Sequence, residues 1–151
     1  MHRRRLFTSL TTSMKPTSFQ TTPQRHYCLI VTALACDKAI QAGIITENKV
    51  TPLLYFFIKA WKNEQIHRWL TAKHSTILRE NRVLTLMNFL YEKGSVFEYD
   101  CKRSTIANLL LETGDLCTIS SYKTVMNNFS MDISPMVASQ AESIFTDTFI
   151  P

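Results

Sequence analysis

Glycine is scarce in this sequence, where 151 residues contain only three. Globular proteins average about 7% glycine. Tight hairpins, β-bulges and phosphate-binding loops depend on glycine, because it adopts positive φ angles without a steric cost. The shortage therefore argues against a β-sandwich and against a P-loop nucleotide-binding fold, and it favours a helical protein.

Acidic residues are absent from the first 36 positions. The same stretch contains five cations, which are Arg3, Arg4, Arg5, Lys15 and Arg25. They equal the formal net charge of +5, because the 12 Lys and Arg and the 12 Asp and Glu that follow cancel. The chain is thus a basic, Ser/Thr-rich leader joined to a neutral body.

Long apolar runs and paired cysteines are missing as well. No stretch reaches the roughly 18 consecutive apolar residues of a membrane-spanning helix, so we expect no transmembrane segment. The four cysteines, Cys28, Cys36, Cys101 and Cys117, form no Cys-x-x-Cys pair, which argues against a zinc knuckle and predicts free thiols. A Cys101–Cys117 disulfide would form only in an oxidising compartment.

The leader, residues 1–27, has the composition of an import segment, and we expect it to be disordered. Leu6, Phe7 and Leu10 would lie on one face of a short helix. A cationic, amphipathic segment without acids is drawn into the mitochondrial matrix by the membrane potential. Residues 25–28 also resemble a presequence cleavage site with arginine at minus three. The sequence therefore predicts a mitochondrial protein.

Two other interpretations of the leader stay open. Residues 28–35 form a short apolar run that ends in Ala-Leu-Ala before Cys36, as a secretory cleavage site would. The charged region before this run is long for a signal peptide, and the run itself is short. Alternatively, the leader is the tail of a cytosolic, nuclear or virally encoded protein, and it either has no function or contacts nucleic acid.

Residues 28–151 are expected to form a single all-α domain, a compact bundle of five or six short helices. Hydrophobic periodicity marks these helices, with Thr51 and Ser75 as expected N-caps and Gly43, Gly94 and Gly114 as expected stops. The helices span residues 29–42, 51–74, 75–93, 104–113 and 119–129, and a last helix starts at Ser134-Pro135. Residues 96–100 alternate enough to form one minor short strand.

Catalytic and metal-binding patterns are not evident. Glu64 and His67 have the Glu-x-x-His spacing of di-iron bundles, but the second copy that such a site requires is missing. No Gly-x-Ser-x-Gly elbow is present, and no cysteine has a nearby histidine on its own element except Cys28, whose neighbour His26 falls in the leader. We therefore expect no enzyme activity, no metal and no cofactor.

A basic helical face is the candidate contact surface. Residues 59–103 carry nine cations against five acids, whereas residues 104–151 carry one cation against five acids. The candidate contact residues are Lys59, Lys62, Arg68, Lys73, Arg79 and Arg82. Trp61 and Trp69 lie among them, which suits RNA or single-stranded DNA binding. Both tryptophans also follow the apolar stripe, however, which favours a place in the core.

The sequence thus predicts a non-catalytic protein that works through contacts with other macromolecules. The favoured role is an organelle-imported accessory subunit or assembly factor with an unidentified protein partner. The alternative is a nucleic-acid-binding or regulatory accessory protein, of viral origin in one version, that uses the basic tail together with the face formed by residues 59–82.

The N-terminus of the native protein distinguishes these localisations. Intact mass spectrometry of protein purified from its own cells should show a chain that begins near Cys28, because import presequences are removed. A chain that begins at Cys36 would support secretion instead. An intact Met1 would count against both.

Overall fold

The computed structural model describes residues 30–72, 76–113 and 121–151. Helices dominate these ranges, residues 30–34 are also helical, and no strand occurs within them. The prediction of an all-α bundle is confirmed. The helices are α3 (Asp37–Gln41), α4 (Glu47–Lys62), α5 (Glu64–Thr71), α6 (Thr76–Glu92), α7 (Arg103–Glu112), α8 (Tyr122–Asn128) and α9 (Pro135–Phe149).

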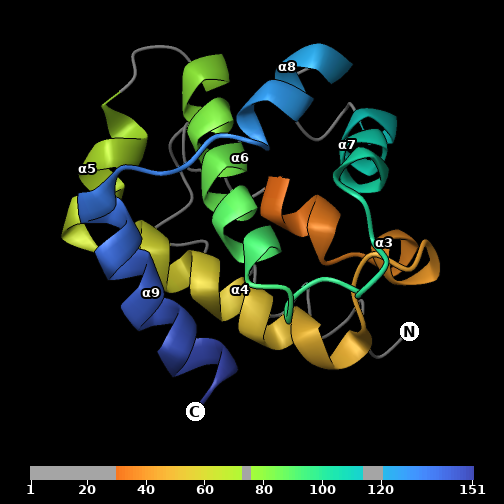
Figure 1. Cartoon of the computed structure of the whole chain (residues 1–151), viewed down its shortest axis with the longest axis horizontal. Helices are drawn as coiled ribbons and strands as arrows, with labels where there is room; N and C mark the ends of the chain where they lie inside the picture. The colour runs from red at the N-terminus through yellow and green to blue at the C-terminus, as the bar shows by residue number, and fades with distance from the viewer. Residues whose placement is uncertain (1–29, 73–75, 114–120) are drawn as a thin grey trace, which may run out of the picture.

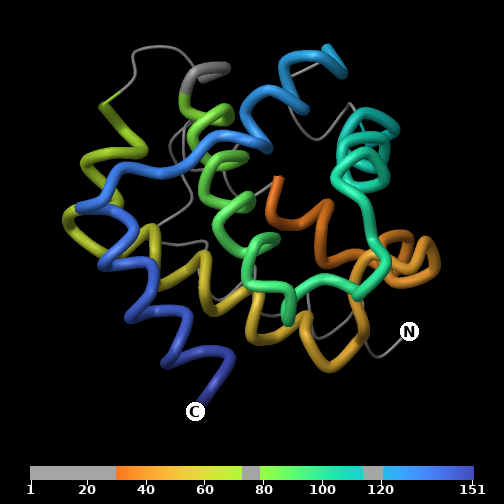
Figure 2. Tube along the Cα trace, in the orientation of Figure 1, coloured from red at the N-terminus to blue at the C-terminus, as the bar shows by residue number. Residues whose placement is uncertain are grey.

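Helix α6 is the centre of the bundle (Figure 1). All six side chains of residues 83–88 are buried, whereas a surface helix buries only one stripe. Leu84, Met87 and Leu90 are fully inaccessible to solvent, as their helical spacing predicts. Helices α5 and α9 lie on one side of α6 and α7 and α8 lie on the other, while α4 runs across beneath α6 (Figures 1 and 2).

Aromatic rings join α4, α6 and α9. The ring of Phe56 on α4 lies 6.4 Å from that of Phe89 on α6 and 6.5 Å from that of Phe149 on α9. On α9, the apolar stripe of Val137, Ala141, Ile144 and Phe145 is buried. Helices α4 and α9 therefore form one continuous apolar layer against α6.

Asn63 divides the long helix that the sequence predicts over residues 51–74. Its backbone is extended (φ −71°, ψ 126°), and its side-chain oxygen accepts a hydrogen bond from the Ile66 amide at 3.0 Å. The Asn63 side-chain nitrogen donates to Gln140 on α9 at 3.0 Å. The capped break turns α5 so that its buried residues, Ile66 and Leu70, also face the core.

Three other boundaries differ from the prediction. Helix α4 begins at Glu47, so Pro52 lies inside the helix and Thr51 does not cap it. The helix expected over residues 29–42 is interrupted at Cys36, whose backbone is extended (φ −84°, ψ 166°). Residues 96–100 form no strand, because one hydrogen bond, from the Glu98 amide to the Ile44 carbonyl, replaces a ladder.

The predicted helix ends at Gly43 and Gly94 are confirmed. Both glycines have positive φ angles, 73° and 75°, which other residues adopt only with strain. Ser134 and Pro135 begin α9 as predicted, with the proline in the first turn. The expected cap at Ser75 and the stop at Gly114 lie outside the described residues.

A buried amide, Asn88, holds the chain segment that leaves α8. Asn88 is 1% exposed, and its nitrogen donates to the Met131 carbonyl at 3.0 Å. Its oxygen accepts from Nε and Nη2 of Arg103, at 3.0 and 2.9 Å. Both polar atoms of this buried amide therefore have hydrogen-bond partners.

Arg103 extends this network to the end of α8. Its Nε also donates to the Phe129 carbonyl at 2.9 Å, and its guanidinium carbon lies 4.4 Å from the centroid of the Tyr91 ring. Thr85 donates to the Asn128 carbonyl at 3.3 Å. A helix leaves its last carbonyls without internal partners. Side chains from α6 and α7 supply those partners for α8.

Replacing Asn88 by alanine should lower the free energy of unfolding by about 2–4 kcal/mol, because the Met131 carbonyl and Arg103 lose a buried partner. Asn108→Ala is the matched control, since Asn108 is an exposed asparagine on α7. It should change stability by no more than about 0.5 kcal/mol. Urea unfolding followed by circular dichroism measures both, and equal effects would contradict the role given to Asn88.

Candidate functional site

The six predicted contact residues do not form one continuous face. Lys59 and Lys62 are exposed on α4, and Arg68 is exposed on α5. Arg79 and Arg82 are partly buried on α6, and Lys73 lies outside the described residues. Of these candidates within the described residues, Lys59, Lys62 and Arg68 are therefore the exposed ones.

Tyr55, Lys59 and Lys62 form an exposed stripe along α4, which we name the α4 stripe. Their spacings of four and three residues place them on one face of the helix. Tyr55 is 43% exposed, and neither lysine makes an ion pair within the described part of the chain. Beside the stripe is a hollow of about 360 Å³, lined by Thr51, Pro52, Tyr55, Lys59, Asp147 and Thr148.

The remaining exposed candidate is already paired. Arg68 forms an ion pair with Glu64 four residues earlier on α5. His67, the histidine of the Glu-x-x-His pattern, contacts Trp61. Its Nδ1 lies 3.0 Å from the Trp61 carbonyl oxygen, and its ring stands edge-on to the Trp61 indole. No cluster of three or more potential metal ligands occurs among the described residues.

The two tryptophans do not offer a stacking platform. Trp61 is 6% exposed and belongs to the core, as its place in the apolar stripe favours. Trp69 is partly buried, and the Arg82 guanidinium carbon lies 4.8 Å from its ring centroid. The exposed aromatic beside the lysines is Tyr55, which the sequence analysis did not select. The signal for it was available, because Tyr55 precedes Lys59 by one helical turn.

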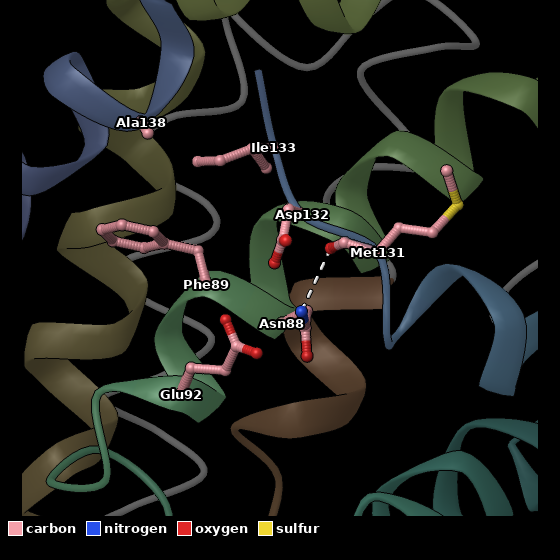
Figure 3. Close-up of a pocket in the computed structure, with 7 residues that line it drawn as sticks. All are labelled: Asn88, Phe89, Glu92, Met131, Asp132, Ile133 and Ala138. Carbon is pink, nitrogen blue, oxygen red and sulfur yellow. Dashed lines mark hydrogen bonds between the residues drawn. The ribbon is translucent and has the colours of Figure 1, made fainter. Parts of the chain in front are cut away.

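A shallow hollow of about 200 Å³ lies where the linker between α8 and α9, residues 131–134, crosses α6. Figure 3 shows that Glu92 and Asp132 both direct their carboxylates into it, beside Asn88. Asn88 and Glu92 are already bonded to Arg103. Asn88 and Glu92 therefore serve the network that holds the linker.

Membrane crossing finds no support in the described helices, none of which combines the necessary length and apolar character. Comparisons with protein-family models, with curated proteins and with solved structures find no match to this chain.

Cys36 and Cys101 are free thiols. Burial raises the pKa of the Cys101 thiol, and the neighbouring carboxylates of Asp100 and Glu98 raise it further. A raised pKa leaves less of the reactive thiolate at neutral pH. Cys101 therefore has the properties of a structural cysteine rather than of a nucleophile. Cys28 and Cys117 lie outside the described residues.

Iodoacetamide at pH 8 should alkylate Cys101 at least about tenfold more slowly in the folded protein than in urea, because burial and two carboxylates suppress its thiolate. Peptide mass spectrometry of timed samples measures the rate at this cysteine alone. Asp100→Asn should accelerate the folded reaction only modestly, since burial is the larger cause. Rapid alkylation in the folded state would contradict the assignment.

Proposed function

We propose that this protein acts by non-catalytic contact with another macromolecule through the α4 stripe, Tyr55, Lys59 and Lys62. The favoured role is that of an accessory subunit or assembly factor imported into an organelle. Its partner would present an acidic protein surface. The observation that carries the proposal is the presence of two exposed lysines beside an exposed tyrosine, with neither lysine in an ion pair within the described ranges.

Three other cations of the body are paired, in contrast to these two lysines. Lys38 pairs with Glu112 at 2.9 Å, Lys93 pairs with Glu142, and Arg103 pairs with Glu92 at 3.4 Å. Lys93 and Arg103 also lie over aromatic rings, so their charges contribute to packing within the protein. Unpaired lysines remain free to attract an anionic partner and to steer its approach.

The leader supports the proposed location in an organelle but does not indicate which partner the protein contacts. Its five cations and lack of acids fit an import address, and removal of the leader would leave a body without net charge. A neutral body with a local cationic stripe is suited to one specific contact rather than to general adhesion to polyanions.

Single-stranded nucleic acid is the second candidate partner, and Tyr55 is the observation that favours it. An exposed aromatic ring next to exposed cationic side chains combines base stacking with phosphate neutralisation. The acid Asp147 lines the adjacent hollow, however, and it would repel a phosphate backbone there. Asp147 therefore favours a protein partner, whose own cations could pair with its carboxylate.

Exchanging both lysines for glutamate, Lys59→Glu with Lys62→Glu, should abolish the protein contact by replacing attraction with repulsion. The matched control is Lys102→Glu with Lys123→Glu, which reverses two exposed lysines elsewhere. Quantitative cross-linking and co-purification from the native cells would compare both variants with the wild type. A partner lost only from the α4-stripe variant supports the proposal, and equal loss from both variants refutes it.

The same variants distinguish the nucleic-acid alternative. If nucleic acid is the partner, fluorescence anisotropy should show that the protein binds a labelled oligothymidylate and that this binding weakens steeply with salt. Tyr55→Ala should reduce the affinity about tenfold. Absent or salt-insensitive binding would exclude this alternative and leave the protein partner as the candidate.

A further inference from the structure

A second hollow, of about 430 Å³, lies on the other side of the linker between α8 and α9. It shares Met131 and Asp132 with the hollow of Figure 3. Its volume falls within the roughly 300–1,000 Å³ range of small-molecule sites. The residues that line it are Trp69, Asn81, Arg82, Thr85, Asn128, Met131, Asp132 and Ser134.

Arg82 is the charged donor of this hollow, which we name the Arg82 hollow. Its Nη1 donates to the Trp69 carbonyl at 2.8 Å, but it makes no ion pair with any carboxylate of the described residues. A guanidinium has five N–H donors, so most of them remain available. Burial also lowers the pKa of Arg82, which reflects a cation partly removed from water without a counter-charge.

The neighbours of Arg82 divide into used and unused groups. The Thr85 hydroxyl donates to the Asn81 and Asn128 carbonyls, and the Asn128 side-chain nitrogen donates to the Thr124 carbonyl. Ser134 at the rim is exposed, and its side chain makes no capping hydrogen bond at the start of α9. The Asp132 carboxylate is directed into the other hollow (Figure 3).

We propose that the Arg82 hollow binds a small phosphate-bearing molecule, with the Arg82 guanidinium and the Ser134 hydroxyl donating to the phosphate oxygens. A phosphate offers several acceptor oxygens, and the planar guanidinium matches their geometry. The hollow is larger than a phosphate alone requires, so the group that carries the phosphate occupies the remainder. This site is separate from the α4 stripe and does not depend on it.

Arg82 also has a structural role, because it supplies a donor to a carbonyl in the last turn of α5 and covers the Trp69 ring. Variants at the rim separate the two roles. Ser134→Glu places a carboxylate beside the phosphate position without touching the Arg82–Trp69 contact. Asp132→Asn removes a negative charge from the rim and should strengthen binding of an anion, which a purely structural role for Arg82 does not predict.

The test is an NMR or calorimetric titration of the full chain with AMP, inorganic phosphate, sulfate and acetate. AMP and phosphate should bind saturably, and Arg82→Gln should weaken both at least about tenfold. Ser134→Glu should abolish binding, whereas Ser139→Glu, at an exposed position of α9 outside the hollow, should leave it unchanged. Asp132→Asn should strengthen binding about two- to fivefold.

Several outcomes would overturn the proposal. These are no saturable binding below about 10 mM of either phosphate ligand, equal binding of acetate and phosphate, or unchanged binding in Ser134→Glu. If Arg82→Gln fails to fold by circular dichroism, Ser134→Glu and Asp132→Asn decide the question. A labelled oligonucleotide distinguishes a backbone phosphate from a free one. If only Lys59→Glu with Lys62→Glu abolishes binding of the oligonucleotide, then the oligonucleotide binds to the α4 stripe and not to the Arg82 hollow.

Discussion

The buried amide of Asn88 is the contact on which the second half of the bundle depends. A polar group without partners costs several kcal/mol in a core, so its bonds to Arg103 and to the Met131 carbonyl are obligatory. These bonds fix where α7 begins and where the linker leaves α8. Helix α8 has only seven residues and would be marginal alone, so its stability comes from such tertiary contacts and from buried Val125 and Phe129.

The enclosure of α6 explains how the cations are distributed. Because α6 is covered on several sides, cations at its boundaries become partners for the surrounding elements. Arg82 contacts the end of α5, Lys93 lies between α6 and α9, and Arg103 reaches α6 from α7. The exposed basic surface is therefore smaller than the number of cations in residues 59–103 suggests. Lys59 and Lys62 are exposed on α4, where no acid of the described part pairs with them.

Local signals predicted the helices well where the cause was local. Gly43 and Gly94 end helices because of their own backbone freedom, and Ser134-Pro135 begins one because proline suits a first turn. The break at Asn63 and the irregular path of residues 96–100 were missed. Asn63 is held by Gln140, 77 residues away, and a strand requires a neighbouring strand, which is absent from the described residues.

The sequence by itself determined the helical class, the apolar stripes and the separation of a cationic leader from a neutral body. These are properties of composition and spacing, which do not depend on distant contacts. Only the tertiary structure decided which charges are used internally and which face outward, that Trp61 belongs to the core while Tyr55 is exposed, and that Arg82 lines a hollow without a carboxylate partner in the described ranges. A charge contributes to the net count wherever it lies, but its availability depends on neighbours that folding brings from elsewhere in the chain.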